Sequence, residues 1–240
     1  MKKVWIDAGH GGKDPGAAAN GLKEKDIALA VSLAIKVRLE SAYEGVQVIL
    51  SRSTDVFLEL ADRTQKANAA EADLLVSVHC NAGGGAGGFE SFRYTNASAA
   101  SRAFQNVLHT EILTAIKPFG VIDRGQKAAN LHMVRESKMP AVLTENLFID
   151  VTADAAKLKR SDVIDAIVTG HVIGIAKYLG LKKKEAGLVS DKVTVIVNGK
   201  KVDDGKLIDG VTMVPLRAVG EALGAKISWD NKTKTATVTK

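Results

Sequence analysis

Several features are scarce or missing in this sequence, and each absence excludes a class of protein. Cys80 is the one cysteine among 240 residues, so no intrachain disulfide can form. This composition fits synthesis in a reducing cytosol, or a fold that does not depend on oxidation. No stretch approaches the roughly 20 apolar residues of a membrane-spanning helix. The N-terminus enters a strand-like run at once, without the long apolar segment of a signal peptide.

The charge of the chain is moderately basic, with a formal net value of +6. Such a charge favours polyanionic surroundings, which include nucleic acid, an anionic membrane and a cell wall that carries teichoic acids. The charge alone does not choose among them. Because no Lys/Arg run is interleaved with aromatic residues, we expect no nucleic-acid partner.

Up to Gly180 the sequence alternates between short apolar runs and longer amphipathic ones. Strands are predicted at residues 4–6, 46–50, 74–78, 88–94 and 141–144, and helices at residues 24–39, 58–70, 97–116 and 162–179. Alternating strands and helices predict an α/β domain with a mostly parallel, twisted sheet that is flanked by helices on both faces.

The character of the sequence changes after Gly180, which divides the chain into residues 1–180, a charged linker at 181–190, and a small α+β domain at 191–240. Within that domain the dipeptide Asn198-Gly199 follows a strand-like run, 193–197, and predicts a β-hairpin. Pro215 predicts the start of a short helix, and two further strands are expected at 225–229 and 235–239. Since the domain carries no histidine or cysteine, we interpret it as a binding module.

Three reactive side chains occur where strands end or a helix begins. His10 follows the first strand among glycines, His79 ends the third strand, and Glu24 opens the first long helix. The carboxyl ends of parallel strands meet at one edge of a sheet, so the two histidines could converge there. Two imidazoles and one carboxylate form the ligand set of a catalytic zinc site. Taken singly, each residue has an ordinary explanation as a loop residue or a complement to a helix dipole.

Glu145 adds a second carboxylate, directly after the predicted strand at 141–144. In that place it could act as a general base toward a metal-bound water and as an acid toward a leaving amine. A solvated acid at a strand end is the alternative interpretation.

The combination of these segments resembles the zinc-dependent, type-3 family of N-acetylmuramoyl-L-alanine amidases over residues 2–180. The segments that carry the resemblance are His10 to Gly16, Glu24, Ser77 to Ala82, Asp123 to Gly125, Pro140 to Glu145, and Phe148. The resemblance implies a zinc-exopeptidase-like fold, with His10, Glu24 and His79 as zinc ligands and Glu145 as the catalytic carboxylate. It also implies hydrolysis, by a zinc-activated water, of the amide that joins muramic acid to the L-alanine of the peptidoglycan stem peptide.

Two positions beside the expected site depart from the family pattern. Asn146 replaces the usual glycine after the catalytic carboxylate, and Asp150 replaces a usual asparagine. Because both positions lie beside the expected site, we expect these departures to affect how the substrate fits more than the catalytic step.

Four segments of the tail stand out in the same way: Val197 to Lys200, Met213 to Arg217, Glu221 to Gly224, and Trp229-Asp230. They resemble the small domain known from the N-terminus of copper amine oxidases, although the tail lacks histidine and cysteine ligands for copper. An amidase without a signal peptide, followed by a small appended domain, is the domain arrangement of a phage or prophage endolysin. Such an enzyme is made in the cytoplasm without a signal peptide, or is extracellular if a signal was trimmed. It acts on the wall, and its C-terminal domain could bind anionic wall polymers.

Two other motifs are set aside. Gly83, Gly85 and Gly88 fit a dinucleotide-binding pattern, but a strand follows them instead of the required helix, so a loop at the mouth of the cleft is expected. Cys80 beside His79 does not predict a cysteine hydrolase, because adjacent residues of a strand point to opposite faces.

Competing functions remain open at this point. One is a zinc peptidase acting on the stem peptide, and another is a wall-binding protein with a degenerate metal site. For the tail, dimerisation or stabilisation is the alternative to wall binding. His109, His132 and His171 occur in apolar contexts and are expected to be structural.

Overall fold

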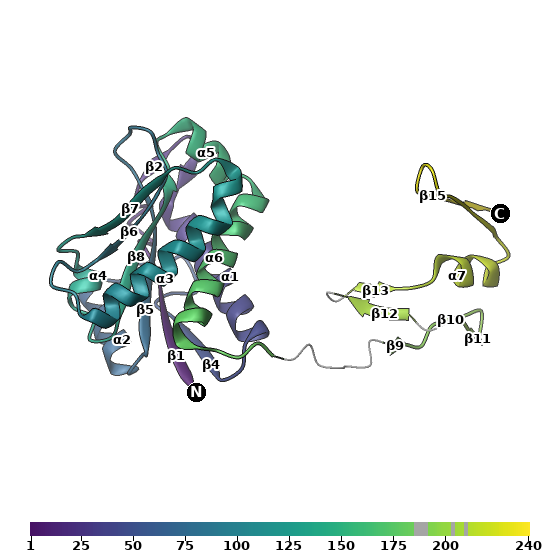
Figure 1. The fold of residues 1–240 in the computed structure, drawn as a ribbon, viewed down its shortest axis with the longest axis horizontal. Helices are drawn as coiled ribbons and strands as arrows, with labels where there is room; N and C mark the ends of the chain where they lie inside the picture. The colour runs from purple at the N-terminus through teal and green to yellow at the C-terminus, as the bar shows by residue number, and fades with distance from the viewer. Residues whose placement is uncertain (185–191, 203–204, 209–210) are drawn as a thin grey trace. The chain divides into compact units, whose positions relative to one another are not determined.

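The computed structural model of the protein describes residues 1–184, 192–202, 205–208 and 211–240. The chain divides into two compact units, Met1–Lys184 and Glu185–Lys240 (Figure 1). The first unit extends four residues into the range expected to be a linker. There the amide of Lys184 donates to the carbonyl of Ala42 at 2.8 Å, and Lys183 forms an isolated bridge with Tyr43. The rest of the expected linker, 185–190, lies outside the described residues.

A six-stranded sheet in the order β4-β1-β5-β8-β6-β7 forms the centre of the first unit. Its strands are β1 (Lys2–Ala8), β4 (Val46–Leu50), β5 (Leu74–Asn81), β6 (Phe89–Arg93), β7 (Asp123–Ala128) and β8 (Ala141–Phe148). The first four strands of that order are parallel. β6 runs antiparallel to β8, and β7 runs parallel to β6. The expectation of a mostly parallel sheet is confirmed, with two reversed strands at one side.

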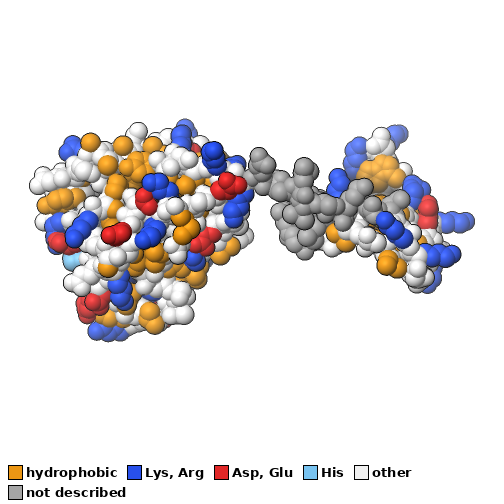
Figure 2. Space-filling model, turned by 90° about the horizontal axis from the view of Figure 1, so that it is seen from below, with side chains coloured by type: hydrophobic (Ala, Val, Ile, Leu, Met, Phe, Trp, Pro, Cys, Tyr) orange, Lys and Arg blue, Asp and Glu red, His pale blue; other side chains and the backbone are white. Residues whose placement is uncertain are grey.

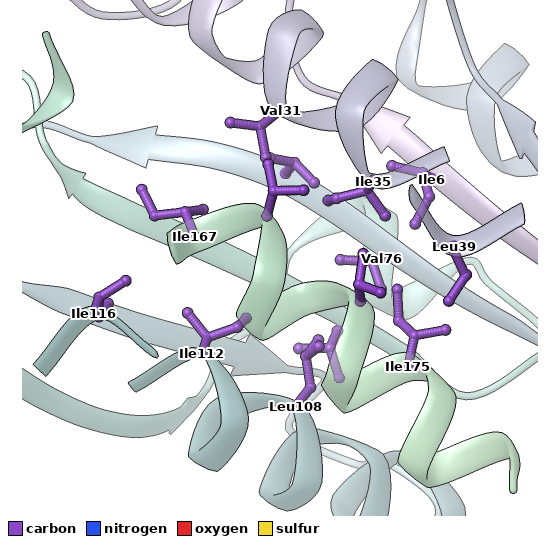
Figure 3. Close-up of a cluster of buried hydrophobic side chains, with 14 of the residues drawn as sticks. Ile6, Val31, Ile35, Leu39, Val76, Leu108, Ile112, Ile116, Ile167 and Ile175 are labelled. Atoms are coloured by element: carbon purple, nitrogen blue, oxygen red, sulfur yellow. The ribbon is translucent and has the colours of Figure 1, made fainter. Parts of the chain in front are cut away.

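Three long helices cover one face of this sheet: α1 (Glu24–Ala42), α3 (Ala99–Ile116) and α6 (Ser161–Leu179). Their apolar stripes meet alternate side chains of the central strands in one continuous cluster (Figure 3). Ile35, Ile112 and Ile175 each come from a different helix, and all three are fully buried. Burying side chains of this size supplies most of the driving force that holds the layers together.

The opposite face carries a smaller cover, made of α2 (Leu60–Ala69) and the short helix α4 (His132–Arg135). Trp5, Leu75 and Leu143 of the sheet pack there against Ala67 and Met133. The remaining elements of the unit are the strands β2 (Ala18–Ala19) and β3 (Leu22–Lys23), the 3-10 helix η1 (Lys117–Phe119) and α5 (Thr152–Leu158). The lighter cover leaves polar side chains at the carboxyl ends of the parallel strands accessible from this face.

The structure differs from the sequence-based expectation at several elements. The sequence predicts neither β7, α4 and α5 nor the short elements β2, β3 and η1. β7 reads Asp-Arg-Gly-Gln-Lys-Ala, and it lacks the apolar alternation by which a strand is identified. β5 continues past His79 to Asn81, and β8 continues past Thr144 to Phe148. The prediction that Glu145 follows its strand is therefore wrong: β8 is paired on both sides beyond this residue, by β5 and by β6.

The second unit contains small antiparallel sheets and one helix. Its elements are β9 (Lys192–Val193), β10 (Ile196–Val197), β11 (Lys200–Lys201), β12 (Gly205–Ile208), β13 (Val211–Met213), α7 (Leu216–Ala222), β14 (Lys226–Asp230) and β15 (Thr235–Thr239). The predicted Asn198-Gly199 hairpin is present between β10 and β11, with both turn residues at positive φ. The single strand predicted at 193–197 is wrong, because β9 pairs with β12 whereas β10 pairs with β11.

Figure 2 shows one face of the first unit, where basic and acidic side chains are mixed. On the second unit, the same view shows mostly basic side chains among apolar ones. Within the described ranges, no helix combines the length and the apolar character that crossing a bilayer requires.

Candidate active site

His10 lies in the loop after β1 with a φ of 59°, a left-handed conformation that few residues other than glycine adopt. Two buried arginines hold this loop. Arg52 Nη2 donates to the carbonyl of Gly9 at 2.7 Å, and Arg63 Nη2 donates to the carbonyl of His10 at 2.7 Å. Asp7 accepts from Arg63 Nη1 at 2.9 Å and balances its charge inside the protein. A costly backbone conformation is thus enforced where a reactive side chain must be presented.

Glu24 is the first residue of α1 and is 4 % exposed. Both of its carboxylate oxygens are fixed by backbone amides: Ala17 donates to Oε2 at 2.9 Å and Cys80 donates to Oε1 at 3.1 Å. The side chain is therefore oriented by the loop before α1 and by β5, which ties together two segments that are distant in sequence.

The three residues predicted as metal ligands converge on one point. His10 Nε2 lies 3.1 Å from Glu24 Oε2, and His79 Nδ1 lies 2.8 Å from Glu24 Oε1. One ligand atom from each residue falls within 4.8 Å of the others. We refer to His10, Glu24 and His79 as the His–Glu–His cluster.

The donor set of the cluster suits a small divalent metal. Zinc takes imidazole nitrogen and carboxylate oxygen at about 2.0–2.2 Å, so two ligands on one ion lie a little over 3 Å apart. The His10–Glu24 separation of 3.1 Å is close to that value. Three protein ligands also leave a fourth position open, as a catalytic site requires.

Asp14 supports the cluster from outside. Its Oδ2 lies 2.8 Å from His10 Nδ1, so it accepts a hydrogen bond from that nitrogen and leaves Nε2 free to face the centre. Its Oδ1 accepts from the amide of Gly16 at 3.0 Å. A carboxylate behind a ligating histidine fixes the tautomer and the orientation of the ring.

The charges of the cluster shift all of its pKa values. Burial opposes ionisation of Glu24, but hydrogen bonds from His10 and His79 outweigh burial and hold its pKa well below the usual range. Burial likewise opposes the charged form of His10, yet Glu24 and Asp14 together raise its pKa to about 9. The pKa of His79 is also raised, against burial, by Glu24 and Glu145. A site that attracts protons this strongly also attracts a cation, which would displace them.

Glu145 lies on β8 directly opposite His79 on β5. Its Oε2 is buried and has no hydrogen-bond partner among the described residues. Burial is the main cause that raises the pKa of Glu145 to about 7, and the nearby Glu24 and Glu90 carboxylates act in the same direction. A carboxyl group with such a pKa can both accept and return a proton near neutral pH.

Two glycines make room for the cluster. A Cβ atom on Gly9 would lie 2.3 Å from His79 Cε1, and one on Gly16 would lie 2.6 Å from Glu24 Oε2. Gly16 also has a φ of 63°. Larger residues at either position would displace a side chain of the cluster.

A cavity of about 290 Å³ opens beside the two histidines. His10, His79 and Asp14 are among its polar lining residues, and Phe57, Leu58 and Leu60 form its apolar part. A polar reaction centre next to an apolar wall is typical of a substrate-binding cleft.

The two departures from the family pattern both have defined contacts. Asn146 is buried, and its Nδ2 donates to the carbonyl of His79 at 3.0 Å, which a glycine could not do. Asp150 Oδ2 accepts from the amides of Gly83 at 2.9 Å and Gly84 at 2.8 Å. Asp150 thereby fixes the start of the glycine-rich loop that joins β5 to β6.

The other histidines and the cysteine make structural contacts. His171 is fully buried between the Thr144 hydroxyl and the Ile167 carbonyl. His109 bridges Ser91 and Asp123, and His132 contacts Thr64. Cys80 lies in the apolar core, and burial raises the pKa of its thiol well above the ordinary value. A protonated thiol in that place is a poor nucleophile.

Sequence reasoning missed the residues that support the cluster and its loop, which are Asp7, Asp14, Arg52 and Arg63. Asp14 offered a usable signal, because an acid four residues after a candidate ligand is close enough to reach its imidazole. The arginines carried no such signal, since their partners are backbone carbonyls of a distant loop.

Comparison with known proteins connects both units to described families. A family model described as N-acetylmuramoyl-L-alanine amidase matches residues 4–177, and one described as copper amine oxidase N-terminal domain matches residues 196–240. The endolysin of Bacillus phage SPP1 is 54% identical over 201 residues, which are 83% of this chain and 74% of the endolysin. The sporulation-specific N-acetylmuramoyl-L-alanine amidase of Bacillus subtilis (strain 168) is 47% identical over 183 residues, 76% of this chain and 70% of that protein.

Solved structures agree with these relatives. The catalytic domain of CwlV, an N-acetylmuramoyl-L-alanine amidase from Bacillus (Paenibacillus) polymyxa var. colistinus, aligns with a TM-score of 0.71 and 37% identity. This alignment covers 76% of the present chain and all of that domain. The expected resemblance is confirmed, since the family match spans well over half of the chain. The chain belongs to the N-acetylmuramoyl-L-alanine amidase family, and it is a hydrolase of the bacterial cell wall.

Proposed function

We propose that the His–Glu–His cluster holds a catalytic zinc ion, and that Glu145 transfers the proton while the amide between N-acetylmuramic acid and L-alanine is hydrolysed. The single observation that carries this proposal is the buried Oε2 of Glu145, which has no partner among the described residues and lies beside the cluster. A buried carboxylate oxygen without a hydrogen bond is costly, and a substrate or a water molecule would satisfy it.

Each residue of the site has a distinct part in this mechanism. When bound, zinc supplies a Lewis acid and an activated water. Glu145 Oε2 accepts the proton of the attacking water and then returns it to the amide nitrogen that leaves with L-alanine. Asp14 keeps the His10 ring in the tautomer whose Nε2 faces the centre. Asn146 holds the backbone of His79 through its carbonyl.

Mass spectrometry of digested peptidoglycan tests the proposed reaction. The amidase frees the amino group of L-alanine and leaves muramic acid intact. A peptidase on the same metal site would instead release fragments cut within the stem peptide. Finding the latter products would overturn the proposed bond, and unchanged products after metal removal would overturn the role of zinc.

We further propose that residues 191–240 bind the cell wall and perform no chemistry. Three observations support this role. The unit is compact by itself, it matches a family model of its own, and it has no histidine or cysteine. Lys200, Arg217 and Lys226 are among the basic residues that could attract anionic wall polymers. Tethering raises the concentration of the enzyme near an insoluble substrate without changing the chemical step.

A chain that ends at Lys184 tests the binding role. We expect it to hydrolyse soluble muropeptides like the full chain but to sediment poorly with whole cell walls. If the shortened chain sediments with walls while the isolated tail does not, the tail has another role. If the shortened chain has half the molecular mass of the full chain in solution, after the mass of the tail itself is subtracted, the role of the tail is dimerisation.

A further inference from the structure

A buried ion cluster lies outside the catalytic residues, on the neighbouring strands β6 and β7. Glu90 is 3 % exposed, and its Oε2 accepts from Arg124 Nε at 2.9 Å and from Lys127 Nζ. Its Oε1 accepts from Asn81 Nδ2 at 2.7 Å. One carboxylate therefore faces two cations, which leaves the group with an excess of one positive charge.

The two cations keep donor capacity for a further partner. The Arg124 and Lys127 side chains are 30% and 39% exposed. Arg124 lies over the ring of Phe148 with its guanidinium carbon 4.5 Å from the centroid, and its Nη2 has no partner in the part of the chain that the structure describes. Nη1 donates to the carbonyl of Gly87 at 3.4 Å, so Nη2 is the nitrogen left to donate to a further partner, and a carboxylate is an acceptor that suits it.

The register of the sheet puts this ion cluster on the same face as the catalytic carboxyl. Glu90 and Glu145 are directly opposite each other on the antiparallel strands β6 and β8. Such pairs project to the same face with Cβ atoms about 4.5–5.5 Å apart. The order across the sheet is thus His79 on β5, Glu145 on β8, Glu90 on β6, and Arg124 on β7.

This order has a consequence for how a substrate lies. Glu145, in the middle, would give its proton to the amide nitrogen, so the leaving peptide extends from that point toward either the His–Glu–His cluster or the cations. The carbonyl of the amide would lie at the cluster, where the proposed metal would polarise it, and this leaves the side of the cations to the peptide. Arg124 is two strands from Glu145, or about 10 Å. A residue or two of extended peptide and a side chain span that distance.

We propose that Arg124 and Lys127 form a subsite that binds a free carboxylate of the stem peptide, in the residue that follows L-alanine. Glu90 is the positioning residue that holds the two cations in place. This inference rests on the proposed function, because it takes Glu145 as the group that meets the leaving nitrogen.

The test compares two soluble substrates with the full chain. Both are N-acetylmuramoyl-L-alanyl peptides, and they differ only in whether the carboxylate of the second amino acid is free or converted to an amide. We expect the wild-type protein to have a higher kcat/KM for the free carboxylate. Arg124→Gln should reduce the ratio of the two kcat/KM values by about 10- to 100-fold, which is the usual range for loss of a charge-assisted hydrogen bond.

Further variants separate binding from folding. Lys127→Gln changes a more exposed cation and should lower the same ratio less. Arg124→Lys keeps the charge but loses the planar fork, and it should restore the ratio in part. Lys159→Gln removes an exposed cation that directly follows α5 and should leave the ratio unchanged. An equal loss on both peptides in Arg124→Gln, or a wild-type protein without preference, would overturn the subsite.

A different result would overturn the proposed catalytic role of Glu145. Glu145→Gln should lower turnover of both peptides by about the same 10²–10⁴-fold, regardless of their carboxylates. If that variant hydrolyses both at wild-type rates, the assignment of Glu145 is wrong, while the ratio of the two substrates still decides the subsite.

Discussion

His79 and Glu145 lie directly opposite each other on the parallel strands β5 and β8, so one sheet register fixes their separation. The register shifts immediately afterwards, between His79 and Asn81, where Asn81 pairs with Phe148. Leu147 takes a φ of 67° in the same region. The irregularity begins beyond the pair, and the regular part of the sheet therefore positions the Glu145 carboxyl against the cluster.

The first prediction concerns the proposed catalytic carboxyl, Glu145. Glu145→Gln keeps the size of the side chain but removes its ability to accept a proton. We expect unchanged zinc content and circular dichroism, with turnover of soluble muramyl peptides lower by about 10²–10⁴-fold. Glu44→Gln, at an exposed position, is the matched control. Wild-type turnover by Glu145→Gln would show that another residue moves the proton.

The second prediction concerns His79, a proposed metal ligand. His79→Ala deletes one of three donors, so the protein should lose most of its zinc and its activity while the core strands remain folded. His132→Ala is the control, because His132 contacts Thr64 and lies outside the cluster. Metal analysis by mass spectrometry after dialysis makes the measurement. Near-stoichiometric zinc in His79→Ala would be incompatible with the assigned ligand set.

The third prediction concerns the carboxylate behind His10. Asp14→Ala removes the acceptor 2.8 Å from Nδ1 and frees the imidazole to rotate or change tautomer. We expect zinc affinity to fall by about 10- to 100-fold, as is typical when such an outer partner is lost. Asp62→Ala, at an exposed position in α2, should leave the affinity unchanged. Competition with a chromophoric chelator measures both variants, and equal affinities would refute the supporting role.

The fourth prediction concerns stability at low pH. Burial lowers the pKa of His171 from 6.5 to about 4, although its hydrogen bond to the Ile167 carbonyl acts in the opposite direction. Above pH 6.5 the residue is neutral in both the folded and the unfolded chain. Between pH 6.5 and about 4, only the unfolded chain binds the proton, so the free energy of unfolding falls as the pH falls. The total loss is on the order of 3 kcal/mol.

Urea unfolding at several pH values between 7.5 and 4 tests this linkage. His171→Gln removes the titrating group, so the stability of that variant should decline less steeply over the same interval than that of the wild-type protein. Parallel declines would mean that carboxyl groups alone cause the acid sensitivity.

Much of the site could be predicted from the sequence because parallel strands share one end. His10 and His79 each come at or near the end of a parallel strand, and Glu24 begins the helix between them. The predicted fold class and the residue types therefore both indicated a metal site at the carboxyl edge of the sheet. Local patterns were sufficient there, because each signal depends on residues within a few positions.

The rest could not be predicted because it depends on pairing between distant segments. The sequence of β7 has no strand-like alternation, and β7 forms because β6 offers a free edge. Nothing near Glu90 indicates that its partners are Arg124 and Lys127, more than 30 residues away. Nothing in the residues around Arg52 and Arg63 indicates that they are buried, yet they are 3 % and 2 % exposed.

The order of strands along the chain differs from their order in the sheet, and this has a consequence for synthesis. β8 is the last strand of the sheet to be made, yet it lies between β5 and β6. A growing chain therefore carries all three residues of the His–Glu–His cluster long before it carries Glu145. Until β8 inserts, β6 and β7 have no strand to join them to β5. The nascent protein can thus gather the three proposed metal ligands early, but it gains the proposed proton-transfer carboxyl only when the sheet closes.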